Sequence, residues 1–231
     1  AMIAAMLAAA KTGPADLVAD LGAGDGRIAI AAARDFGARA IGVEYDAKMA
    51  ALAARNAARA GVADRVRIVE GDIFKEDFSR ASVVTLYLLP ELNLQLRPTI
   101  LAMPPGTRVV SYQFTMAEWE PDAVIRGTPW DAYLWIVPAP VAGRWRVADE
   151  SGSEVAVLDL AQQFQKAGGT ISIAGTAQPL LGPTLSGREF RFSFVDRDGG
   201  LRAVRLDVSG DRAPGESRLG DYAVRWSARR E

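Results

Sequence analysis

The stretch that decides the fold spans residues 20–27 and reads Asp20-Leu21-Gly22-Ala23-Gly24-Asp25-Gly26-Arg27. It follows a short apolar run at residues 15–21 and precedes an alanine-rich run at residues 27–36. These runs predict a buried strand and a helix. Glycine adopts backbone conformations that other residues avoid, and it lets a ligand approach the backbone closely. The stretch therefore predicts a ligand-binding turn between the first strand of a sheet and the helix that follows.

Strand and helix patterns alternate through the first half of the chain. Further strands are predicted at residues 40–43, 66–69, 82–88 and 108–114. Helices are predicted at residues 47–60 and along the face formed by Leu92, Leu96, Ile100 and Leu101. The apolar residues 1–7 predict a short buried helix, because a membrane span needs roughly 20 apolar residues. The alternation predicts an α/β fold, with a Rossmann-like parallel sheet and helices on both faces.

The pattern changes near Pro138, beyond which helical patterns nearly vanish. Strands are predicted at residues 155–164, 170–174, 189–195, 201–208 and 222–227, with glycine-rich turns between them. The expected core consists of Val155, Val157, Phe164, Phe190, Phe192, Phe194, Val204, Leu206, Val224 and Trp226. We therefore expect two domains, residues 1–138 and 139–231, the second a small antiparallel all-β sandwich or barrel.

Composition removes several classes of function. The chain has 231 residues, a formal net charge of −1, no cysteine and no histidine. Disulfides and thiolate nucleophiles are excluded, and the commonest general base and transition-metal ligand are missing. No basic field is available to hold a nucleic-acid backbone. We expect no metal site, no nucleic-acid partner and no membrane partner.

The spacing of the glycines indicates the kind of ligand. A dinucleotide-binding turn reads G-x-G-x-x-G, whereas here the third glycine comes one residue earlier. Asp20 ends the predicted strand, and its carboxylate would repel a pyrophosphate but suits a cationic amino-acid group. S-adenosylmethionine carries such a group and has no phosphate, so we expect it as the cofactor.

Two more acids end the next two strands. Glu44 follows the glycine turn by about 20 residues, where an acid accepts hydrogen bonds from ribose hydroxyls. Asp72 follows the third strand and can accept the adenine amine, while Ile73 packs on the ring. Because the carboxyl ends of parallel strands line one crevice, these residues are expected together. The predicted cofactor site comprises Asp20, Gly22, Ala23, Gly24, Asp25, Gly26, Glu44, Tyr45, Asp72 and Ile73.

Taken in order, these motifs resemble those of class I S-adenosylmethionine-dependent methyltransferases, over residues 15–114. Together with Leu86-Tyr87-Leu88-Leu89-Pro90, the glycine motif is similar to the branch of FAM173-type protein-lysine methyltransferases and bacterial relatives with a C-terminal β domain. The resemblance implies methyl transfer to a protein lysine. It also implies a Pro-Thr-bearing segment before the first helix that closes over the cofactor, which this chain does not carry.

The segment after the fourth strand is expected to face the methyl group. Tyr87 and Asn93 offer uncharged polar atoms and are the candidate catalytic residues, and Pro90 joins them as a candidate substrate contact. Apolar surroundings depress the pKa of an amine and so favour its neutral, nucleophilic form. The structural alternative is that Tyr87 is a core aromatic residue and Asn93 a residue at a helix start.

Three functions remain open at this point. The first is N-methylation of an amine-bearing protein acceptor, and the second is methylation of a small molecule. The third is a non-catalytic cofactor-binding or interaction module. A nicotinamide oxidoreductase is disfavoured by the glycine spacing. The β domain either walls the acceptor pocket or binds a protein partner. We expect a cytoplasmic protein, or an exported one if a signal peptide preceded Ala1.

Overall fold

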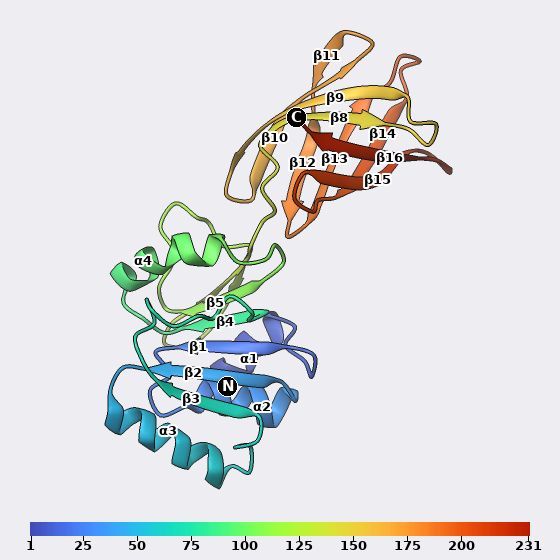
Figure 1. Ribbon diagram of the computed structural model, residues 1–231. Helices are drawn as coiled ribbons and strands as arrows, with labels where there is room; N and C mark the ends of the chain where they lie inside the picture. Colours follow the sequence, from blue (N-terminus) through green and yellow to red (C-terminus); the bar gives the residue numbers. More distant parts are fainter. The chain divides into compact units, whose positions relative to one another are not determined.

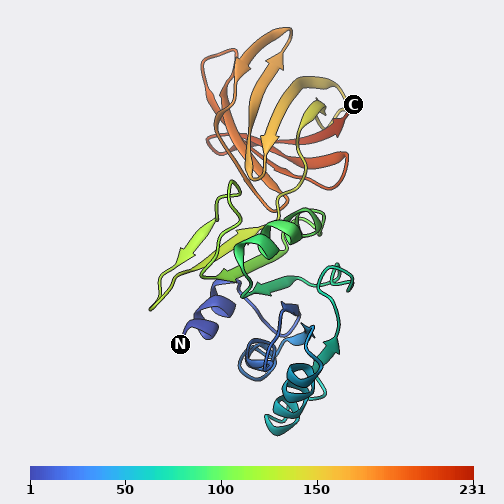
Figure 2. The same ribbon diagram turned by 90° about the vertical axis from the view of Figure 1, so that its left-hand side faces the viewer.

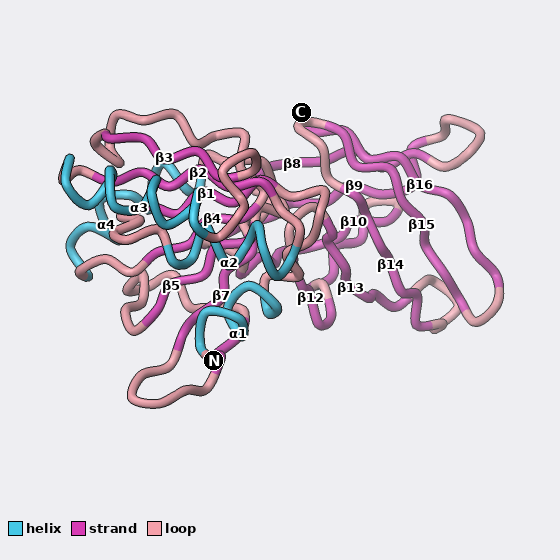
Figure 3. The backbone as a smooth tube through the Cα atoms, turned by 90° about the horizontal axis from the view of Figure 1, so that it is seen from below, coloured by secondary structure: helices cyan, strands magenta, loops and turns pink.

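The computed structural model describes residues 1–231 as two compact units, Ala1–Val137 and Pro138–Glu231 (Figure 1). All four helices lie in the first unit, and the second consists of strands and loops alone (Figure 3). None of the helices is long and apolar enough to cross a membrane.

A seven-stranded sheet forms the centre of the first unit, in the order β3-β2-β1-β4-β5-β7-β6. The first five strands run parallel, whereas β7 and β6 are antiparallel additions at one edge. The strand bounds are β1 (Leu17–Leu21), β2 (Arg39–Glu44), β3 (Val66–Glu70), β4 (Val83–Leu86), β5 (Arg108–Tyr112), β6 (Ala123–Ile125) and β7 (Ala132–Ile136). The strand order reverses direction between β1 and β4, and such a switch point is where open α/β sheets bind ligands.

Helices cover both faces of this sheet. They are α1 (Met2–Ala9), α2 (Arg27–Phe36), α3 (Ala47–Arg59) and α4 (Pro90–Leu101). α1, α2 and Ala57 of α3 share one apolar cluster with Val110 of β5. Successive residues of a strand point to opposite faces, so Ser111 points away from that cluster. Asn93 of α4 hydrogen-bonds Ser111, which places α4 on the opposite face. The predicted fold class is confirmed.

The second unit is a nine-stranded antiparallel sheet that curls into a nearly closed barrel (Figure 2). Its order is β11-β10-β9-β8-β16-β15-β14-β13-β12. The bounds are β8 (Gly143–Ala148), β9 (Glu154–Gln163), β10 (Lys166–Ile173), β11 (Thr176–Pro179), β12 (Leu181–Ser186), β13 (Glu189–Val195), β14 (Leu201–Asp207), β15 (Arg212–Leu219) and β16 (Tyr222–Arg230).

Hydrogen bonds link the two ends of the sheet where the barrel nearly closes. The Gln178 amide of β11 donates to the Val195 carbonyl at 2.7 Å and accepts from the Val195 N–H at 3.0 Å. The Leu180 N–H donates to the Gly169 carbonyl at 3.0 Å. Of the two architectures predicted from the sequence, the barrel is the one observed.

The barrel interior confirms most of the expected core and corrects two members. Phe190, Phe192, Phe194, Val204, Leu206 and Trp226 are buried, and Val155 and Val224 pack partly buried against them. Val157 was wrongly assigned, because Ala156, Leu158 and Leu160 form the buried face of β9. Phe164 was also wrongly assigned, since it lies in the β9–β10 turn with a φ of 54°.

Candidate cofactor and acceptor site

The glycine turn joins β1 to α2 at the carboxyl edge of the sheet. Gly22, Gly24 and Gly26 have φ angles of 79°, 56° and 84°, a region that side-chain-bearing residues rarely adopt. The N–H groups of Gly22 and Ala23 both donate to the Val43 carbonyl at 2.9 Å. The turn is therefore fixed to the end of β2, and it requires glycine at three places.

The space around each glycine differs. A Cβ atom at Gly22 would lie 2.7 Å from Leu88, and one at Gly26 would lie 3.0 Å from Ala53 of α3. At Gly24 the nearest atom would be Met49 Cε at 4.0 Å. Gly22 and Gly26 thus allow close packing of the chain on itself. Gly24 faces open space, as expected where a ligand approaches the backbone.

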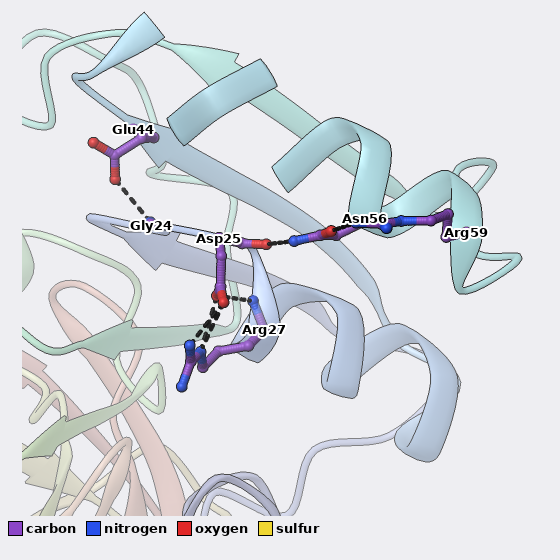
Figure 4. A network of polar contacts seen from close by, with 6 residues as sticks. All are labelled: Gly24, Asp25, Arg27, Glu44, Asn56 and Arg59. Atoms are coloured by element: carbon purple, nitrogen blue, oxygen red, sulfur yellow. Dashed lines mark hydrogen bonds and ion pairs between the residues drawn. The ribbon is translucent and has the colours of Figure 1, made fainter. Parts of the chain in front are cut away.

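Glu44 spans the turn from the end of β2. One carboxylate oxygen accepts the Gly24 N–H at 2.7 Å (Figure 4). The other accepts the Asp46 N–H at 3.0 Å. Asp46 in turn caps α3 by accepting the Met49 N–H. Glu44 therefore lies against the glycine turn, as its predicted role at the ribose requires, and that role stays a prediction.

Sequence reasoning missed the contribution of Asn56. Its side-chain amide donates to the Asp25 carbonyl at 2.9 Å, which ties α3 to the glycine turn (Figure 4). The Asp25 carboxylate forms an ion pair with Arg27 at 2.7 Å, and the Arg27 hydrogen bond lowers the pKa of Asp25. Asp25 is thus held by Arg27, the first residue of α2, and its cofactor contact stays a prediction.

Asp20 is buried beneath the turn, with a side chain that is almost inaccessible. One oxygen accepts the Thr85 hydroxyl at 2.8 Å, whereas Oδ2 has no hydrogen-bond partner. Burial raises the pKa of Asp20 to about 6, with a smaller contribution from the charges of Asp25 and Glu44. A buried carboxylate with one unpaired oxygen is a ready acceptor for a cation.

The third predicted acid lies in the loop after β3. Asp72 accepts the Phe74 N–H at 3.0 Å and lies 3.4 Å from the Lys75 ammonium. Ile73 is half-buried, whereas the neighbouring predicted residue Tyr45 is 80% exposed. The Gly71 N–H bonds the Glu44 carbonyl at 2.9 Å. The structure thus brings the β2 and β3 ends together at one edge, and the adenine contacts remain predictions.

The acceptor candidates occupy the ends of β4 and β5. Tyr87 is 56% exposed, so the core alternative for this residue is wrong. Its ring makes an edge contact with Tyr112 at 5.0 Å between centroids. Pro90 is the first residue of α4, a position at which the backbone N–H that proline lacks has no partner within the helix. The sequence pattern gave no sign of Tyr112, which lies after β4 in the chain and next to it in the sheet.

Asn93, predicted to offer a polar atom to the acceptor, has no exposed surface. It is fully buried, its amide donates to Ser111 Oγ at 3.1 Å, and its Oδ1 has no partner. Asn93 therefore fastens α4 to β5, on the face of the sheet opposite to the apolar cluster against which Tyr112 packs. A contact between Asn93 and the acceptor stays a prediction.

These residues suit S-adenosylmethionine. The unpaired oxygen of Asp20 matches a cationic group, and the open side of Gly24 leaves room at the backbone. The carboxylates of Glu44 and Asp72 are acceptors at the positions expected for ribose and adenine. When bound, the cofactor supplies a methyl group already activated by its sulfonium.

Comparisons with known proteins agree with this reading. Residues 20–123 match the family model described as the ANTKMT methyltransferase domain. A protein-lysine N-methyltransferase of Saccharolobus islandicus is 45% identical over 123 residues, which cover 52% of this chain and 76% of that protein. The mouse adenine nucleotide translocase lysine N-methyltransferase is 36% identical, over 46% of this chain and 47% of its own.

A solved structure resembles the first unit closely. It is an RNA methyltransferase from Salinibacter ruber in complex with S-adenosyl-L-homocysteine, with 45% identity and a TM-score of 0.59. The match covers 60% of this chain and 92% of that one. The relatives thus share the methyltransferase unit, and the chain spans less than half of the mouse enzyme. By this identity and coverage, the chain belongs to the ANTKMT branch of the class I S-adenosylmethionine-dependent methyltransferases.

Proposed function

We propose that this chain transfers a methyl group from S-adenosylmethionine to the side-chain amine of a protein lysine. The observation that carries the proposal is the identity of 45% with an archaeal protein-lysine N-methyltransferase, along 76% of that protein. The chemistry at the ends of β4 and β5 agrees with it. The acceptor would be a protein, and the compartment we propose is the cytoplasm.

The acceptor side of the site favours a neutral amine. The exposed Leu89 and Pro90 flank Tyr87 and present apolar surface. Apolar surroundings disfavour the charged ammonium. The faces of Tyr87 and Tyr112 attract the ammonium on arrival, and the apolar residues favour release of its proton to water. The nitrogen lone pair then forms the new N–CH₃ bond while the S–CH₃ bond breaks.

The chain must also position the acceptor amine relative to the cofactor. Asn93 holds α4 against Ser111, and Tyr112 contacts Tyr87. These contacts fix the aromatic pair relative to the glycine turn, because β4 pairs directly with β1 and β5. Holding two reactants in a near-attack geometry lowers the barrier of a bimolecular reaction.

The test uses methyl-labelled S-adenosylmethionine and three acceptor fractions of one cell lysate. These are protein treated with ribonuclease, RNA freed of protein, and the small-molecule fraction. We expect label in the protein fraction, recovered as methylated lysine after hydrolysis. The Gly24→Val variant is the control for cofactor-dependent transfer. Label confined to RNA or to small molecules would overturn the proposal.

A further inference from the structure

One mouth of the barrel opens into a cavity of about 280 Å³. Its walls include Val155, Ile173, Phe194, Val224 and Trp226, and Ser217 contributes a polar group. Mouths of β-barrels are frequent binding places for small molecules. The cavity lies wholly within the second unit, and the proposed methyl transfer makes no use of it.

Ser217 is an unusual residue for this position. It points inward from β15, between Val204 of β14 and Val224 of β16 in the same cross-strand row. Its side chain is 1% exposed, and its hydroxyl has no hydrogen-bond partner. Burying an unpaired hydroxyl is unfavourable, and valine occupies the neighbouring positions in the row. The hydroxyl is therefore best explained by a ligand that pairs with it.

Two aromatic rings form one side of the cavity. Phe194 and Trp226 stack with 5.8 Å between centroids and an interplanar angle of 23°. Further flat rings pack well against such surfaces, in offset or edge-on geometry. The cavity volume is at the lower end of the range for small-molecule pockets. Both features favour a ligand of one or two fused rings.

The charges at the rim select against anions. Asp196 pairs with Arg202 at 3.0 Å, and Asp149, Asp198 and Arg197 also line the opening. Three carboxylates face two guanidinium groups, so an anionic ligand would meet net repulsion. The rim thus disfavours an anion, and the apolar walls disfavour burial of a charge of either sign, so an uncharged molecule fits the cavity best.

We propose that the barrel mouth binds a small, neutral, flat aromatic molecule, with its ring against Trp226, which Phe194 backs by stacking, and its polar edge at the Ser217 hydroxyl. The ligand is a free molecule, because the rim and the small volume leave little room for a peptide backbone. This site is independent of the proposed lysine methylation.

The test is ligand-detected NMR on the full chain with three probes of the same ring. These are indole, its anion indole-3-acetate, and N-acetyltryptophanamide, which carries a peptide backbone. We expect indole to bind with a dissociation constant of about 1 mM, as a fragment of this size does. The acetate and the tryptophan amide should bind at least about tenfold more weakly, through repulsion and exclusion.

Three variants locate the site. Ser217→Ala removes the hydroxyl without adding bulk to the cavity, so indole affinity should fall about 2- to 10-fold while the melting temperature does not fall. Val224→Trp fills the cavity and should abolish binding. Ser227→Ala, on the exposed face of β16, is the matched control and should bind as the parent chain does.

Several results would overturn the inference. One is the absence of indole binding at millimolar concentration. Another is unchanged indole affinity in Ser217→Ala and Val224→Trp. Equal binding of N-acetyltryptophanamide and indole would assign the cavity to a protein side chain and refute the free molecule. Near-ultraviolet circular dichroism and a cooperative melting transition, measured in parallel, confirm that the barrel of each variant is folded.

Discussion

Substitution of the buried carboxylate of Asp20 should affect folding stability and cofactor affinity in opposite directions. Its pKa is raised from 3.8 to about 6, mainly by burial. Since each pH unit corresponds to 1.36 kcal/mol, the ionised form costs about 3 kcal/mol more in the folded chain than in water. Stability from this group is therefore complete below about pH 4 and is lost as the pH rises to about 6.

Asp20→Asn removes that cost and keeps an acceptor for the Thr85 hydroxyl. We expect the variant to be more stable than the parent by about 1–3 kcal/mol near pH 7, with no gain near pH 4. The measurement is urea unfolding at several pH values. Asp16→Asn is the control of opposite sign, because hydrogen bonds from Ser82 and Arg108 outweigh burial and lower the pKa of Asp16.

Binding should show the converse dependence. A cationic cofactor group favours the ionised Asp20, so a proton must leave when the cofactor binds below pH 6. Calorimetry should show affinity for S-adenosylhomocysteine falling as the pH drops from about 7 to 5, and approaching tenfold per pH unit. Asp20→Asn should bind more weakly near pH 7 and lose this dependence. A flat affinity profile in the parent chain, with no stability gain in the variant, would refute the reasoning.

Three further substitutions address the rest of the site. Glu44→Ala should weaken S-adenosylhomocysteine binding by about 1–3 kcal/mol through lost charge-assisted hydrogen bonds, and unchanged calorimetric affinity would refute its assignment. Gly24→Val should fold but not bind the cofactor. Gly61→Val places the same side chain at a φ of 70° in open space at the end of α3, and it should bind normally. Tyr112→Ala should reduce kcat/KM for a lysine acceptor about 2- to 30-fold without changing cofactor affinity. Tyr112→Phe keeps the ring and should retain most activity. Equal rates for the parent chain and Tyr112→Ala would exclude a role of the aromatic pair in binding the acceptor.

Most helices and strands of the first unit could be predicted from the local pattern of apolar residues and glycines. The helix bounds at Arg27–Phe36 follow directly from the alanine-rich run between Gly26 and Gly37, because glycine at both ends marks the limits of a helix. β7 was missed although Trp135 lies within it. Its fully buried indole donates to the Trp119 carbonyl at 2.7 Å, and this long-range contact leaves no sign in a local sequence window.

The error at β9 has a different cause. Val155 and Val157 form one alternating set, and Ala156, Leu158 and Leu160 form the other. Both sets are apolar, so alternation alone leaves the buried face undecided. Asp159 shares the outward face with Val157 and could have decided between them. An irregularity in the β8–β9 pairing near Ala148 also turns Val155 partly into the interior.

The polar groups of the site divide along the edge of the sheet. Acids stand at or just after the ends of β1, β2 and β3: Asp20 before the glycine turn in the chain, Glu44 bonded to that turn, and Asp72 in the loop after β3. Tyr87 and Tyr112 instead stand after β4 and at the end of β5, with their rings in contact.

This division has a chemical reason. A carboxylate beside the acceptor would stabilise its ammonium form and raise its pKa, which would reduce the nucleophilic fraction. In the predicted site, carboxylates beside the cofactor would stabilise a ligand that is already a cation. In the predicted arrangement, the acids of β1, β2 and β3 would therefore bind the cationic donor, and the aromatic pair at β4 and β5 would leave the amine free to lose its proton.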